Sequence, residues 1–460
     1  MYFFDIKKLE NITTEYFNLI EDYFGAFYTP GLNKYLEAQK FKMLETAIQA
    51  ILVSIEDLEE DLQEFWQKNS TEVISIIENT DIFKVLYSGD MSPLDGINFI
   101  KKTALYLDTL LIEDPISRLL DTKIVFTDKE YLFELTKHIF NLLDMKKLFF
   151  GEGSIPLLVI FPPLINKEIA VQIRHEVKNS SANYFSSLLQ RDFKDYADVW
   201  DYLKSIKSSE QLINDIKDTR LLFLNEDNIL ERLNKLQIRT KKTTKLDTTS
   251  LTMGEILGLE IYGRFSAIGT QVFQSQYLSS QIVFDYKELW DLYKWDINQT
   301  VQVTPNVDNT MLHALQTQEF RWLENIDIDK FYLLRNEDEI KMVREALRRN
   351  IYHTLNGVSE NHVKKQASIN LDDILNEHSR KLEGLSKDLK KKFSIDTLAF
   401  IGGVISSVPA HLGIVPVIGA VSTIYGAVDI FTSTTKLVKE KKRINKSLMG
   451  VLIDAKQRSI

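Results

Sequence analysis

The sequence predicts a mainly α-helical protein, a multi-helix bundle body followed by a C-terminal hydrophobic helical hairpin. Three observations predict this class. Only nine prolines and 18 glycines occur in 460 residues, which favours long uninterrupted helices. Apolar residues recur three and four positions apart in several segments. A stretch of 32 residues near the C-terminus, 397–428, contains no Asp, Glu, Lys or Arg.

The length of 460 residues is sufficient for about two to four domains. Two polar segments without helical periodicity, 239–252 and 355–370, are typical of domain boundaries or linkers. These boundaries predict an N-terminal helical domain at 1–150, a helical segment with at most a short strand at 151–238, a central helical domain at 253–355 and a C-terminal module at 371–460.

The clearest N-terminal helix is predicted from Asn33 to Gln67, where apolar residues form an a/d seam. The seam consists of Phe41, Leu44, Ile48, Ile51, Ile55, Leu58, Leu62 and Phe65. Further helices are expected over Pro93–Ile112 and Lys129–Leu148. Later in the chain, Thr252 and Glu255 have the spacing of a capping box at the start of a helix.

At most a small β element is expected, near 155–165. The surrounding segment SIPLLVIFPPLIN is apolar and ends soon after Pro162-Pro163. Its 13 residues are too few to cross a bilayer, whose hydrocarbon core needs about 20 helical residues. A buried strand fits the segment better.

Charge is divided unevenly along the chain. Residues 380–460 contain 14 basic and six acidic residues, a net charge of +8, so the first 379 residues carry −17. The negative charge of the body disfavours binding to nucleic acid, whereas the basic tail suits an anionic lipid surface or the acidic body itself. Two solvated helix faces explain the same charges.

The familiar signatures of catalysis are absent from the sequence. No cysteine is present, which excludes disulfides, cysteine-ligated metals and a cysteine nucleophile. There is no Walker A motif, no GxSxG elbow and no HExxH pair. The sequence therefore predicts no cofactor and no metal, and it favours a function other than catalysis.

The N-terminus does not have the pattern of a signal peptide, which predicts a cytoplasmic protein.

Two short patterns offer a nuclease alternative. Arg348 and His353, five positions apart, resemble the R-x4-H motif of HEPN ribonucleases, in which the Arg and His act together on the RNA 2′-hydroxyl and phosphate. A basic helix C-terminus explains the same residues. Glu176 and Lys178 resemble the end of a PD-(D/E)xK nuclease site, where the acid binds a divalent metal. That family places the motif after a strand, whereas this segment has the pattern of a helix.

The uncharged stretch is better explained as a hairpin than as a single span. One helix of 32 residues would be about 48 Å long, against a hydrocarbon core of about 30 Å. Division at the prolines gives two helices within a hairpin at 397–432. Small residues along both helices favour close packing. The predicted membrane-inserting residues are Phe400, Ile401, Gly402, Gly403, Ile405, Pro409, Pro416, Gly419 and Gly426.

Basic residues flank the hairpin on both sides, which favours the same, cytoplasmic side for its two ends. The predicted lipid-anchoring residues are Lys390, Lys391, Lys392, Lys439, Lys441, Lys442 and Arg443. The hydropathy pattern resembles the hydrophobic hairpin of colicin-type pore-forming domains. A hairpin buried at the centre of a helical bundle would show the same composition.

The leading functional prediction is a membrane-active effector that inserts its hairpin into, or forms pores in, an anionic membrane. Such a chain suits a bacterial toxin or an anti-phage abortive-infection protein, held soluble until a protein trigger or self-association releases it. It would associate with the inner face of the membrane. The alternatives are a HEPN-like or metal-dependent nuclease and a soluble helical scaffold with a buried hairpin.

Overall fold

The computed structural model describes residues 5–26, 28, 55–80, 82–87, 107–121, 128–151, 155–222, 231, 235, 251–284 and 287–300. The chain divides into two compact units, and all of these residues belong to the one that contains Met1–Gln316 and Arg349–Leu355. The predicted hairpin and its basic flanks lie outside the described residues. The described part is mostly helical, as predicted, and contains a small parallel sheet.

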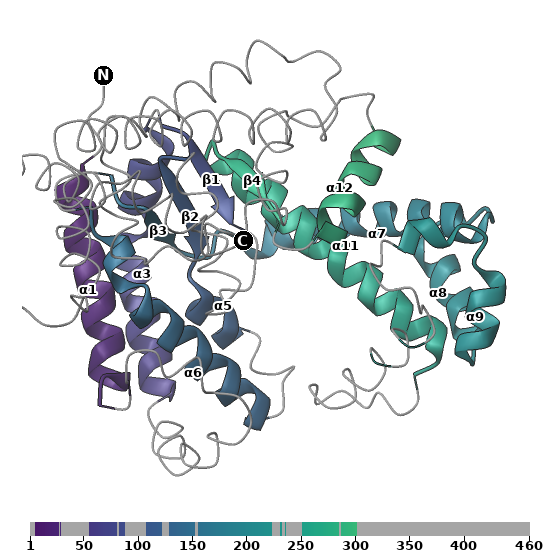
Figure 1. Ribbon diagram of the computed structural model, residues 1–460, viewed down its shortest axis with the longest axis horizontal. Helices are drawn as coiled ribbons and strands as arrows, with labels where there is room; N and C mark the ends of the chain where they lie inside the picture. Colours follow the sequence, from purple (N-terminus) through teal and green to yellow (C-terminus); the bar gives the residue numbers. More distant parts are fainter. Residues whose placement is uncertain are drawn as a thin grey trace, which may run out of the picture. The chain divides into compact units, whose positions relative to one another are not determined.

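The sheet has four parallel strands in the order β3-β2-β1-β4 (Figure 1). The strands are β1 (Lys84–Tyr87), β2 (Thr109–Glu113), β3 (Leu158–Phe161) and β4 (Gln281–Val283). In register, Leu86 lies opposite Leu111 of β2 and Ile282 of β4. Nearly every strand residue is buried, as expected of a parallel sheet that is covered on both faces.

The β content exceeds the prediction. The strand expected near 155–165 is confirmed as β3, but three further strands join it. The helix predicted over Pro93–Ile112 is wrong at its end, because residues 109–112 belong to β2. Strands of three to five residues, with polar residues only at their ends, show no alternation that distinguishes them from a buried helical turn.

Among the described residues, four helices accompany the first half of the sheet. They are α1 (Ile6–Phe24), α3 (Ile55–Glu78), α5 (Pro115–Asp121) and α6 (Asp128–Asp144), and a short 3-10 helix, η2 (Lys146–Phe149), follows α6. The C-terminal half of the predicted seam is confirmed, because Ile55, Leu58, Leu62 and Phe65 are buried along α3. The rings of Phe65 and Trp66 also pack 5.6 and 5.7 Å from the ring of Tyr16, which joins α3 to α1.

A second group of helices lies between β3 and β4 in the sequence. It comprises α7 (Lys167–Leu189), α8 (Tyr196–Ser205), α9 (Ser209–Asp215), the 3-10 helix η3 (Thr219–Leu222) and α11 (Met253–Tyr277), with α12 (Lys287–Thr300) following β4. These helices share one hydrophobic core, in which Tyr184, Leu203 and Trp290 are almost completely buried. Helix α11 packs against α7 and α8 and then leads directly into β4 (Figure 1).

The start of α11 is fixed by side-chain hydrogen bonds. The predicted capping box is confirmed, since the Thr252 hydroxyl accepts from the Glu255 amide and the Glu255 carboxylate accepts from the Thr252 amide. The Thr252 hydroxyl also donates to the Leu203 carbonyl at 3.2 Å, and the Gly254 amide donates to the Ile206 carbonyl at 3.2 Å. The first turn of α11 is thereby held against the end of α8.

Candidate ligand-binding site at the carboxyl edge of the sheet

The strand order creates a topological switch point in the sheet. Strands β1, β2 and β3 follow one another in one direction, whereas β4 pairs with the opposite side of β1. In open parallel sheets, ligands bind outside the carboxyl ends of the strands, near the point where the order reverses. The carboxyl ends of β1 and β2, beside β4, are therefore the place to look for a site.

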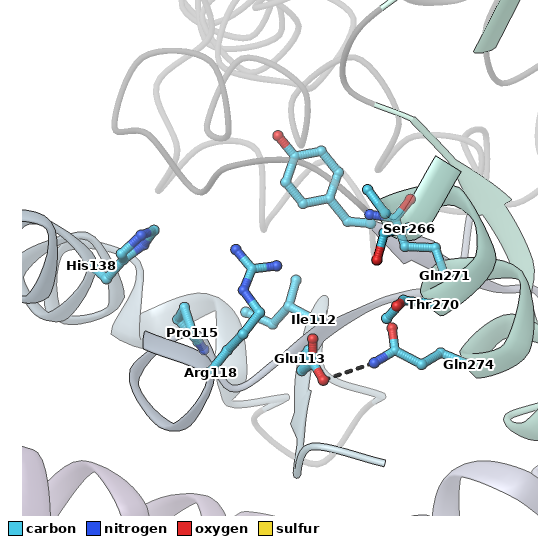
Figure 2. A pocket seen from close by; sticks show the side chains of 11 residues that line it. Ile112, Glu113, Pro115, Arg118, His138, Ser266, Thr270, Gln271 and Gln274 are labelled. Carbon is cyan, nitrogen blue, oxygen red and sulfur yellow. Dashed lines mark hydrogen bonds between the residues drawn. The ribbon is translucent and has the colours of Figure 1, made fainter. Parts of the chain in front are cut away.

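A cavity of about 210 Å³ lies at this edge. Tyr87 at the end of β1 and Glu113 at the end of β2 line it, together with Arg118 of α5 and His138 of α6. Helix α11 supplies the opposite wall through Ser266, Ala267, Thr270, Gln271 and Gln274. Figure 2 shows the Arg118 guanidinium between His138 on one side and the α11 residues on the other.

The most clearly defined contact of the cavity joins β2 to α11. The Gln274 amide donates to Glu113 Oε1 at 2.7 Å, between residues 161 positions apart in the sequence (Figure 2). Gln274 is 2% exposed, so replacement of its amide by an apolar group would remove a hydrogen bond from a partly buried carboxylate oxygen. The bond therefore fixes the orientation of the Glu113 carboxylate.

Asp114, the residue after Glu113, links the end of β2 to α1, α3 and α5 through its carboxylate. Its buried carboxylate accepts from the Tyr16 hydroxyl at 2.7 Å and from the Trp66 indole N–H at 2.7 Å. It also accepts from the Ile116 amide at 3.0 Å and the Ser117 hydroxyl at 2.5 Å at the start of α5. Burial, followed by the nearby Asp114 carboxylate, raises the pKa of Tyr16 well above its usual value. These bonds position α5, which carries Arg118.

The groups around the cavity suit a polar ligand with at least one anionic part. The Arg118 guanidinium donates hydrogen bonds in a planar fork that matches phosphate and carboxylate groups. Glu113 accepts from hydroxyl or amine donors, and the Ser266 and Thr270 hydroxyls both donate and accept. Among the described residues, no cluster of three or more His, Asp or Glu side chains is arranged to hold a metal ion.

Of the site residues predicted from the sequence, the structure describes Glu176 and Lys178. Glu176 and Lys178 are exposed on α7, where Glu176 accepts from the Gln172 amide at 3.3 Å, and neither lines this cavity. Arg348, His353, the membrane-inserting residues and the lipid-anchoring residues lie outside the described ranges. Within those ranges, no helix combines the length and the apolar composition needed to cross a membrane.

Sequence reasoning missed Glu113, Arg118 and Gln274. A signal for Glu113 was present, because Glu113-Asp114-Pro115 follows an apolar run and combines two acids with a proline suited to the first position of a helix. No local pattern marked Gln274, which is a buried amide in an otherwise ordinary helix.

Comparison with family models, curated proteins and solved structures finds no match to this chain.

Proposed function

We propose that the α/β part of this protein binds a small polar molecule that carries an anionic group. The observation that carries the proposal is the cavity at the carboxyl edge of a parallel sheet, where a guanidinium, a carboxylate and four polar side chains of α11 face one another. Its position beside the switch point is the one at which open α/β sheets bind ligands. Arg118 is the group that binds the anionic part.

Arg118→Gln will weaken binding of an anionic compound by at least about tenfold, because a charge-assisted hydrogen bond contributes about 1.5–3 kcal/mol. The full chain is screened with inorganic phosphate, citrate and adenosine 5′-monophosphate, by shifts in the thermal unfolding midpoint and then by calorimetry. Arg174→Gln is the matched control, because Arg174 is exposed on α7 and does not line the cavity. The proposal fails if no compound binds, or if both variants weaken binding equally.

We also propose, as a second function, that the C-terminal module acts on membranes. The uncharged stretch 397–428 with basic residues on both sides supports this role, as do the glycines along the predicted hairpin. The expected partner is anionic lipid, on the cytoplasmic face of a membrane. A ligand bound in the α/β part is then a candidate for the trigger that releases the hairpin.

Ile401→Asp will abolish leakage of vesicles that contain anionic lipid, because an aspartate at the centre of a membrane helix costs about 2.5–3.5 kcal/mol. The measurement is release of an encapsulated dye by the full chain, with a chain that ends at Lys392 as the inactive reference. Thr434→Asp, just beyond the hairpin at 397–432, is the control and should leave leakage unchanged. Absence of leakage at every lipid composition would refute the membrane role.

The nuclease alternative is tested on the same protein. Toxicity is measured as arrest of growth in bacteria that express the protein. If a His353→Ala variant loses this toxicity but still causes vesicle leakage, the result favours the ribonuclease over the membrane effector. Full toxicity of that variant would remove the ribonuclease.

A further inference from the structure

We propose that the ligand of the carboxyl-edge cavity carries a pair of neighbouring hydroxyl groups, as a ribosyl group does, and that the Glu113 carboxylate binds them. This inference rests on the proposed ligand-binding function and adds the chemical class of the ligand. The anionic part of the same molecule then lies at Arg118. The expected ligands are therefore sugar phosphates and nucleotides.

The position of Glu113 in the sheet is the first argument. Glu113 is the last residue of β2, and β2 lies next to β1 on the side away from β4. In nucleotide-binding sheets with this strand order, an acidic residue at the corresponding strand end accepts hydrogen bonds from ribose hydroxyls. A carboxylate suits this task because it only accepts hydrogen bonds, whereas both hydroxyls of a vicinal diol donate.

The contact with Gln274 is the second argument. The Gln274 amide donates to Oε1 at 2.7 Å, and a carboxylate, with about four acceptor positions, can accept several hydrogen bonds at once. Because Gln274 is buried in α11, it holds the carboxylate at a fixed angle instead of leaving it to rotate. A fixed acceptor loses less conformational entropy on binding and discriminates better between ligands with one hydroxyl and ligands with two.

The distribution of charge around the cavity is the third argument. An anionic group next to Glu113 would be repelled, so the carboxylate faces a part of the ligand that donates hydrogen bonds and carries no negative charge, and the hydroxyls of a diol meet both conditions. The Arg118 guanidinium lines the same cavity and provides the cationic end (Figure 2). A molecule with a diol at one end and a phosphate at the other satisfies both groups at once.

The test measures binding of matched ribosyl and deoxyribosyl probes to the full chain by calorimetry. The pairs are ribose 5-phosphate with 2-deoxyribose 5-phosphate, and adenosine 5′-monophosphate with its 2′-deoxy counterpart. The ribosyl compound should bind at least about tenfold more tightly, the effect of a hydrogen bond to a charged group. Glu113→Gln should narrow that preference to about threefold or less while it leaves the deoxyribosyl compound bound. Glu168→Gln, at an exposed position of α7 that does not line the cavity, should leave the preference unchanged.

The possible failures are distinguishable. Equal binding of ribosyl and deoxyribosyl compounds overturns the inference, as does a Glu113→Gln variant that keeps the full preference. Binding of citrate or phosphate without any ribosyl preference overturns the inference but leaves the ligand-binding function intact. Absence of binding by every compound overturns both. If Glu113→Gln does not fold, the paired comparison on the unaltered chain still decides the matter.

Discussion

Asp114→Ala will lower the free energy of unfolding by about 3–5 kcal/mol. The substitution removes the common acceptor of Tyr16 and Trp66 and leaves two buried donors without a partner, at about 1–3 kcal/mol each. It also removes the side-chain bonds to Ile116 and Ser117 at the start of α5, which contribute about 1 kcal/mol as a helix cap. Urea unfolding followed by circular dichroism measures the loss.

Two further variants separate the contributions at Asp114. Tyr16→Phe removes one donor and leaves the carboxylate three others, so it should cost about 1–2 kcal/mol. Asp201→Ala is the control, because Asp201 is exposed on α8 in a surface ion pair, and it should change stability by less than about 0.5 kcal/mol. If Asp114→Ala proves no worse than this control, the buried carboxylate has no structural role.

Gly254→Ala will destabilise the protein by about 2–4 kcal/mol. A Cβ atom at this position would lie 2.2 Å from the Leu203 carbonyl oxygen and 2.9 Å from its carbon, and backbone atoms cannot rotate away as a side chain can. The first turn of α11 would have to move away from the end of α8. That movement breaks the hydrogen bonds to the Leu203 and Ile206 carbonyls and adds to the cost of overpacking.

The same helix offers a control of opposite sign. A Cβ atom on Gly263 would meet nothing within 4 Å, so Gly263→Ala should stabilise the protein by up to about 1 kcal/mol through its higher helix propensity. Both variants are measured by the shift in the urea midpoint at constant slope. Destabilisation by both, to a similar extent, would mean that helix backbone effects and not the contact with α8 determine the cost at Gly254.

The helices could largely be predicted from the sequence, because their signals are local. The seam through Leu58 and Leu62 and the capping box of Thr252 and Glu255 each lie within a few turns of chain. The extent of the sheet could not be predicted, because each strand is short, lacks polar and apolar alternation, and pairs with strands that are distant in the sequence. Pairing of β1 with β4 joins Leu86 to Ile282, a contact that no local pattern specifies.

The candidate site escaped prediction for the same physical reason. Glu113 and Gln274 are ordinary polar residues until folding brings them within hydrogen-bond distance. The sequence drew attention instead to the uncharged stretch 397–428, whose unusual composition is visible without any tertiary structure. Composition reveals segments that differ from an average protein, whereas a pocket assembled from two strands and three helices contains only residues of ordinary composition.

Helix α11 is a rigid element with a close contact near each of its ends. Its 25 residues span about 38 Å, with Gly254 wedged beneath the end of α8 near one terminus and Gln274 bonded to Glu113 near the other. An axial shift of a single residue, about 1.5 Å, is more than half the length of the 2.7 Å bond at Glu113. The seating of α11 against α8 therefore determines where along the cavity Gln274 meets Glu113, although the two contacts share no residue.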